Sequence, residues 1–332
     1  MDKLKALIAR LNVAQERQPG LAVAYGMNKK FSDDRANLYV VSLGWYGFLA
    51  IFPTLLLVVT VLGYIGAESL GHSFLNTLSK FPIVGTEFKP GNEHISGNPF
   101  GLVVGLAGLL YGGQGVTNSA QQAFTRVWNI PQYRLPGFFP RFLRSVAGLA
   151  TIGAAFLVNA AASGYATGHG RNIAVRIVII AAMAAMNVGF YLLAYRLLSP
   201  AEVPTRALLP GSIFGAISFT LLITVGTGLV QHQLNGSNST YGAAGGVIGL
   251  VTFLLLLSKL SIYATELNVV LDRHLYPRAL PTCDPLPADR RVYRDIAQGE
   301  RRHEDERVGV GFPPDAKEEA ATDAMEQRDI RA

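Results

Sequence analysis

The stretch LLLLSKLSIYATELNVVL, residues 254–271, has the length and apolar composition of a membrane-spanning helix, yet it contains Lys259 and Glu266. A charged side chain in hydrocarbon is costly unless it is paired, hydrated or able to reach an interface. Half of the 332 residues are hydrophobic and only 16% are charged, whereas soluble globular proteins have about 25% charged residues. The stretch therefore predicts a membrane span with one stripe turned away from lipid.

This stretch is part of one of six segments that are long and apolar enough for a helix to cross the hydrocarbon core, which takes about 17 to 25 residues. They lie at about 39–66, 100–124, 144–166, 173–198, 207–232 and 242–272. The predicted fold class is an all-α, polytopic membrane protein with six transmembrane helices in a domain spanning 39–272. Residues 1–38 form an amphipathic N-terminal segment. Residues 273–332 are rich in mixed charge and proline, which predicts a mostly disordered tail.

Basic residues flank the spans unevenly. The connection between spans two and three, for example, carries Arg126, Arg134, Arg141 and Arg144 with no acidic residue between them. Because cytoplasmic loops are enriched in Lys and Arg, both termini are predicted to be cytoplasmic. The same rule explains the net charge of +6 without nucleic acid. The N-terminal segment fits either an interfacial helix on anionic lipid or a helix packed on the protein's own loops.

Span two carries polar residues on its cytoplasmic half. Gln114, Asn118 and Gln121 recur at positions i, i+4 and i+7, so they share one helix face. Because unpaired amides are costly in hydrocarbon, this face is expected to look inward. Two interpretations remain open: hydrogen bonds between helices, or a hydrated substrate path.

In span six, Thr252, Lys259, Tyr263 and Glu266 form one stripe, and a second stripe includes Asn268. The face with Leu256 and Ala264 is apolar and is expected to meet lipid. Lys259 is expected to be the costlier charge, because Glu266 lies nearer the cytoplasmic boundary. Lys259 could reach the headgroups, form a structural ion pair with Glu266 or another helix, or line a functional cavity.

Recognisable catalytic motifs are absent from the sequence. It has no Walker A loop, no GxSxG elbow, no HExxH and no Cys/His cluster, and its single cysteine, Cys283, excludes an intramolecular disulfide. No enzyme activity, cofactor or metal site is therefore expected. The Ser32-Asp33-Asp34 cluster before span one favours helix N-capping over ion binding.

Three parts of the chain together resemble a known family. They are FSDDRANLYVVSLGWYGFLAIFPTLLLVV, YGGQGVTNSAQQAFTRVWNIPQYR, and LAYRLLSPAEVPTRALLPGSIFGAISF followed by NSTYGAAGGVIGLVTFLLLLSKLSIYATELNVVLDR. This succession is similar to the YihY/BrkB family of six-span bacterial inner-membrane proteins, historically mislabelled ribonuclease BN. The resemblance covers about residues 20–275. The residues that match its pattern are Asp33, Asp34, Pro53, Pro210, Gly211, Tyr241, Gly242, Glu266 and Asn268, whereas Lys259 and Tyr263 depart from it.

The resemblance implies a multi-pass protein of the bacterial plasma membrane with both termini cytoplasmic. Family members are suspected of transporting or flipping an envelope lipid or another amphiphile. The expected substrate path is lined by Gln114, Asn118, Gln121, Lys259, Tyr263, Glu266 and Asn268. Expected partners are membrane lipids, with anionic headgroups at the cytoplasmic face, and a homo-oligomer is possible. A non-transporting envelope scaffold is the alternative, and a ribonuclease is disfavoured because cytoplasmic metal-ligand clusters are absent.

Overall fold

The computed structural model describes Gln15 and residues 18–64, 99–135, 137–166, 173–199, 202–234, 242–280 and 285–312. Within these residues the regular structure is entirely helical, without strands. The helices are α2 (Pro19–Asp33), α3 (Asn37–Tyr64), α6 (Pro99–Val127), α7 (Phe138–Ala166), α8 (Ile173–Leu198), α9 (Leu209–Leu234), α10 (Gly242–Asp272) and α11 (Pro287–Gly299), with short 3-10 helices η1 (Gln132–Arg134) and η2 (Thr205–Leu208).

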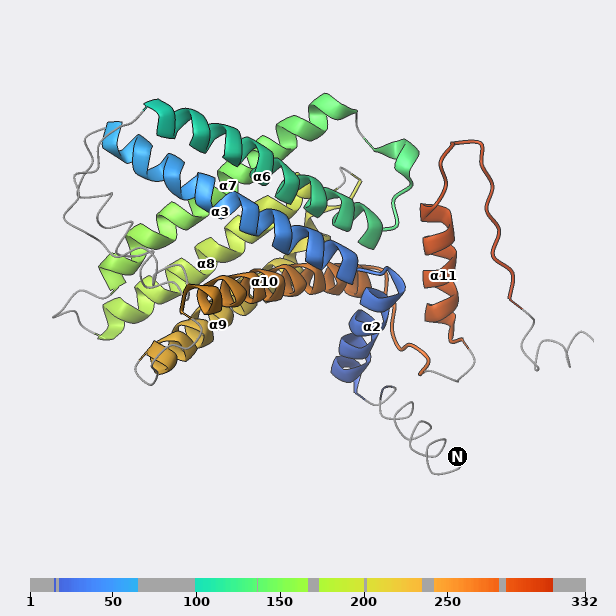
Figure 1. Cartoon of the computed structure of the whole chain (residues 1–332). Helices are drawn as coiled ribbons and strands as arrows, with labels where there is room; N and C mark the ends of the chain where they lie inside the picture. The colour runs from blue at the N-terminus through green and yellow to red at the C-terminus, as the bar shows by residue number, and fades with distance from the viewer. Residues whose placement is uncertain are drawn as a thin grey trace, which may run out of the picture.

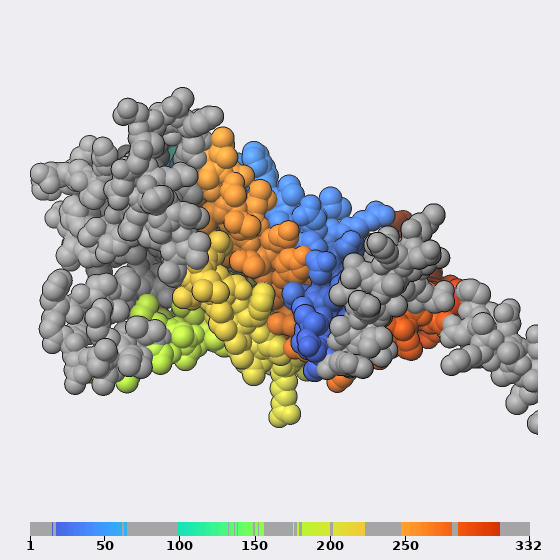
Figure 2. All heavy atoms as spheres, turned by 90° about the horizontal axis from the view of Figure 1, so that it is seen from below, coloured from blue at the N-terminus to red at the C-terminus, as the bar shows by residue number. Residues whose placement is uncertain are grey.

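The six long helices pack side by side as a bundle (Figure 1). Each packs on the next in chain order, from α3 through α6, α7, α8 and α9 to α10, and α10 packs back on α3, so the order closes into a ring. Figure 2 shows α10 lying between α3 and α9 on one face of the molecule. The last helix is therefore held between the first and the fifth.

The long helices coincide with the predicted spans. The largest difference is at the start of α7, which begins at Phe138 instead of 144. Within the described residues, five helical stretches are long and apolar enough to cross a membrane: Asn37–Val61, Pro99–Val127, Ala181–Leu198, Thr205–Leu222 and Val247–Asp272. The third predicted span, in α7, is not among them.

Small residues let α3 and α6 approach closely. A Cβ added at Gly112 of α6 would lie 2.8 Å from the Cα of Ala50, and one at Gly108 would lie 2.5 Å from the ring of Pro53. Pro53 lies inside α3, where it removes one backbone hydrogen bond. Gly112 thus packs against the α3 backbone and Gly108 against the Pro53 ring, and neither position leaves room for a side chain.

Both α2 and α11 lie at one end of the bundle, here named the α2/α11 end (Figure 1). The predicted tail, residues 273–332, includes α11, a helix with Asp289 and Val292 fully buried. Residues 313–332 lie outside the described residues, as do residues 1–14, 16 and 17 of the predicted N-terminal segment. The N-capping interpretation of the Ser32-Asp33-Asp34 cluster is wrong, because Ser32 and Asp33 belong to the last turn of α2 and Asp34 follows it.

Candidate functional site: a buried ion cluster between α2 and α10

One face of α2 is built to approach the end of α10. Ala22, Gly26 and Lys30 recur at four-residue intervals and are all buried. At Gly26, an added Cβ would lie 3.1 Å from the carbonyl oxygen of Leu275, just after α10. Glycine therefore permits the close approach, and the lysine one turn later is carried into the protein interior.

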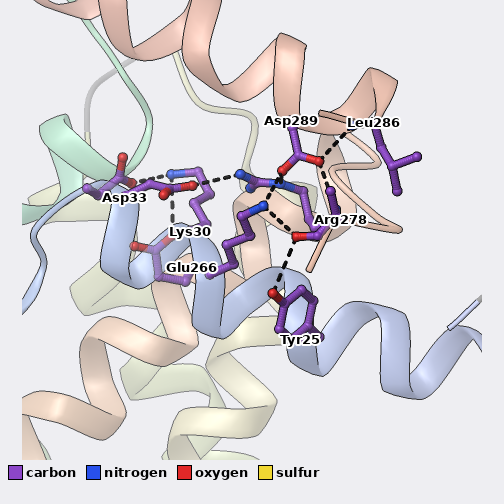
Figure 3. Close-up of polar contacts among 10 residues, drawn as sticks. Tyr25, Lys30, Asp33, Glu266, Arg278, Leu286 and Asp289 are labelled. Carbon is purple, nitrogen blue, oxygen red and sulfur yellow. Dashed lines mark hydrogen bonds and ion pairs between the residues drawn. The ribbon is translucent and has the colours of Figure 1, made fainter. Parts of the chain in front are cut away.

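The Lys30 ammonium group meets three acceptors from three parts of the chain. It donates to a carboxylate oxygen of Asp34 and, at 2.7 Å, to the carbonyl oxygen of Val127 at the end of α6. Its Nζ also lies 3.3 Å from Oε2 of Glu266 on α10. Figure 3 shows Lys30 and Glu266 facing each other across α2 and α10. The ammonium group therefore donates two hydrogen bonds and lies in ion-pair contact with a third oxygen.

Lys30, Asp34 and Glu266, here named the triad, have side chains with no exposed area. Burial by itself lowers the pKa of Lys30, but the carboxylates of Glu266 and Asp34 raise it above the ordinary value of 10.5. The ammonium group is therefore charged at neutral pH. Burial raises the pKa of Asp34 despite the opposing effect of Lys30, as expected for a carboxyl group removed from water beside a second carboxyl group.

A second group of ion pairs joins α2, the segment that follows α10, and α11. Asp289 of α11 is fully buried. It accepts hydrogen bonds from the Lys29 side chain (2.8 Å), the Arg278 side chain (2.6 Å) and the N–H groups of Ala279 (2.8 Å) and Leu286 (3.0 Å). Arg278 also contacts Asp33 at 2.7 Å, and Figure 3 shows Arg278 between the two carboxylates. Asp33 and Asp34 therefore belong to two adjacent ion clusters.

The family model described as Virulence factor BrkB matches residues 27–285, more than half of the chain. This chain belongs to the BrkB virulence factor family. Membership and the apolar helices together identify an integral membrane protein. No curated protein and no solved structure matches it. The BrkB match contains the entire triad and ends before Asp289.

Two residues that carry the BrkB resemblance meet where α9 packs on α10. The N–H of Gly211 donates to Oδ1 of Asn268 at 2.6 Å, and both residues are buried. A Cβ at Gly211 would lie 2.1 Å from the carbonyl oxygen of Ala264. Pro210 lies in the first turn of α9, where its missing N–H is not needed. Ala264 is fully buried, so the prediction that it faces lipid is wrong.

The predicted stripe on α10 does not share one environment. Glu266 is fully buried beside Lys30, whereas Lys259 is exposed. That Lys259 is the costlier charge in the membrane stays a prediction. The Lys259 ammonium lies 6.0 Å from the centre of the Tyr263 ring. The Tyr263 hydroxyl donates to the side-chain oxygen of Asn28 on α2 at 2.9 Å.

The polar residues predicted to share one face of α6 also lie in different environments. Gln121 is buried and donates to the Ser145 hydroxyl of α7 at 3.1 Å, which fits a hydrogen bond between helices. Gln114 is half-buried and Asn118 is exposed. Gln121 therefore contacts α7, whereas Glu266 contacts Lys30 of α2. These two predicted site residues have no contact partner in common. Tyr241 lies outside the described residues, and Gly242 starts α10.

The cations of both ion clusters were not identified from the sequence. The sequence contains a signal that Lys30 is buried, because Lys30 continues the four-residue spacing of Ala22 and Gly26. It contains no such signal for Arg278 and Asp289, since they lie in a polar segment. Among the residues that the structure describes, no three His, Cys, Asp or Glu side chains are grouped to hold a metal ion.

Proposed function

We propose that this BrkB family protein is a non-enzymatic transporter or flippase-like protein of the bacterial plasma (inner) membrane. Its substrate would be an envelope lipid or another amphiphilic, anionic molecule. In this proposal the six long helices all cross the membrane, and both termini are cytoplasmic, as is the α2/α11 end with its basic residues. The positive-inside rule supports this orientation.

The observation that carries the substrate class is the position of Lys259. It is exposed on the same surface of α10 as Ile248 and Leu256, which are 64% and 45% exposed. A lysine on an apolar outer surface extends its charged end toward the headgroup region. There it would meet an anionic headgroup, and the nearby Tyr263 hydroxyl links this position to Asn28 of α2.

A translocation assay in proteoliposomes tests the proposal. Fluorescent lipids with anionic or zwitterionic headgroups would be followed across the bilayer in the presence of the wild-type protein and of Lys259→Met. Wild type should exceed protein-free liposomes, and Lys259→Met should lower the rate for anionic lipid about fivefold, equivalent to about 1 kcal/mol per cation near anionic headgroups. Lys259→Arg is the charge-retaining control. No acceleration by wild type contradicts the function, and an unchanged Lys259→Met rate contradicts the role of Lys259.

Asn118 favours a second candidate, a non-transporting envelope scaffold. Its amide is exposed within the apolar helix α6, seven residues after Tyr111, which is 72% exposed. Amides in spans commonly bond to a partner helix. A photo-crosslinker placed at 118 should capture another polypeptide, a second copy of this chain included, if the protein is a scaffold. Capture without any lipid translocation would favour the scaffold over the transporter.

The proposed orientation can be tested with the single cysteine, Cys283. It follows α10 in sequence, so it should be cytoplasmic. A membrane-impermeant maleimide should label it in inverted inner-membrane vesicles and in spheroplasts only after permeabilisation. Labelling of intact spheroplasts would contradict the orientation.

A further inference from the structure

The triad holds one cation and two carboxyl groups in a space closed to water. Both Glu266 oxygens and Oδ1 of Asp34 are buried and lack a hydrogen-bond partner among the described residues. Two buried carboxylates beside one ammonium group would leave an uncompensated negative charge, which is strongly unfavourable. We propose that the triad is a proton-binding site, in which Glu266 holds an exchangeable proton while Lys30 and Asp34 remain ionised.

The geometry distinguishes the two carboxyl groups. Lys30 donates a hydrogen bond to Asp34, whereas its Nζ lies 3.3 Å from Oε2 of Glu266 as an ion pair without a hydrogen bond. Asp34 is therefore the counterion. Glu266 is the carboxyl group with no hydrogen bond to either oxygen, so a proton there neutralises the less well compensated charge. Binding follows from COO⁻ + H⁺ → COOH, with no other reactant.

Among the residues that the structure describes, Lys30 is the cation that pairs with Glu266. Asp34 lies near Arg126 and Asp33, but Arg126 pairs with Glu300 and Asp33 with Arg278. On α10 itself, Tyr263 is the titratable group beside Glu266. Helices α3 and α9, which also pack on α10, contain no Lys, Arg, Asp or Glu, and η2, which packs on α10 as well, carries Arg206 with its side chain exposed. The charge balance of the triad is therefore set by its own three groups.

Loss of the proton has a structural consequence. It leaves two carboxylates, one at the end of α2 and one on α10, with a single ammonium group between them. Their repulsion acts directly on the contact between α2 and α10. Proton binding thus favours the docked position of α2, and this inference does not depend on whether the protein transports a substrate.

Infrared difference spectroscopy of the full-length protein in lipid nanodiscs tests the site. At neutral pH, where an ordinary glutamate of pKa about 4.3 is ionised, wild type should show the carbonyl band of a protonated carboxyl group. The band should disappear reversibly as the pH is raised. Labelling all glutamate carboxyl groups with carbon-13 should shift this band, whereas labelling aspartate should leave it in place.

A matched pair of variants completes the test. Glu266→Gln keeps the shape of the protonated side chain and should remove the band, whereas Glu202→Gln, at an exposed pair with Arg134, should retain it. Isotope labelling needs no substitution, so the inference stays testable even if Glu266→Gln fails to fold. No protonated carboxyl band in wild type at neutral pH, a band that shifts with labelled aspartate, or a band that persists in Glu266→Gln would each overturn the proposal.

Discussion

Lys30 of α2 lies 3.3 Å from Glu266 of α10, and both side chains are fully buried. The first residue belongs to a short helix beside the bundle and the second to the last helix of the ring. Their contact, reinforced by Asp34, attaches α2 to α10, the helix that also packs on α3. A change in the charge of the triad therefore acts on the junction between the N-terminal segment and the bundle.

The triad predicts unequal costs for losing its cation and its counterion. Lys30→Met leaves Asp34 buried without its partner, which should cost about 3–5 kcal/mol. Asp34→Asn should cost clearly less, because Glu266 can release its proton and become the counterion. Denaturant unfolding in mixed micelles would measure both. The exposed lysine substitution Lys259→Met serves as control and should change stability by no more than about 0.5 kcal/mol.

Equal losses for Lys30→Met and Asp34→Asn would contradict this order. They would mean that Glu266 cannot take over as counterion. A loss for Lys259→Met as large as that for Lys30→Met would show instead that the outer lysine has a structural partner.

The contact between Gly211 and Asn268 predicts a steric effect at the start of α9. Gly211→Ala places a Cβ 2.1 Å from the carbonyl oxygen of Ala264, so α9 and α10 must separate. The expected cost is about 1–3 kcal/mol, as for other overpacked cores. Gly189→Ala is the control, because its Cβ would meet no atom within 4 Å and alanine is about 0.5–1 kcal/mol better in a helix. Thermal unfolding should therefore shift in opposite directions, and a neutral Gly211→Ala would contradict the close approach.

Helix positions in this chain could be predicted because apolar length is a local property. Each run of apolar residues forms a helix whatever it packs against, so the range 242–272 coincides with α10. Gly211 and Asn268 were recognised through the family pattern, although their mutual hydrogen bond was not.

The environments of Lys259 and Glu266 could not be predicted in the same way. Helical periodicity places residues on stripes but does not say which neighbour a stripe meets. Glu266 faces inward because α2 returns to the end of α10 and supplies Lys30, a contact between distant parts of the sequence. Without knowledge of that partner, the sequence allows the two charges to be compared only by their depth in the span.

The hydrogen bond between Gln121 and Ser145 predicts a modest role in packing α6 on α7. Gln121→Leu should cost about 0.6 kcal/mol, the average for hydrogen bonds between membrane helices. Asn118→Leu, at an exposed position on the same helix, should not destabilise the monomer. Unfolding measurements in micelles would compare the two. A larger loss for Asn118→Leu than for Gln121→Leu would reverse the assignment and place the structural hydrogen bond at Asn118.

Asp289 predicts that acid releases α11. Burial by itself raises the pKa of Asp289, but hydrogen bonds from Lys29, Ala279 and Arg278 outweigh it and hold the pKa below the ordinary 3.8. The stabilisation is therefore fully present above pH 3.8 and is lost as the pH falls through the lower folded value. Asp289→Asn should reproduce the release at neutral pH, with α11 amides exchanging hydrogen roughly 100-fold faster for a loss of about 3 kcal/mol. Asp295→Asn, at a half-exposed pair with Arg273, should change exchange little; equal effects of both variants would contradict an anchoring role for Asp289.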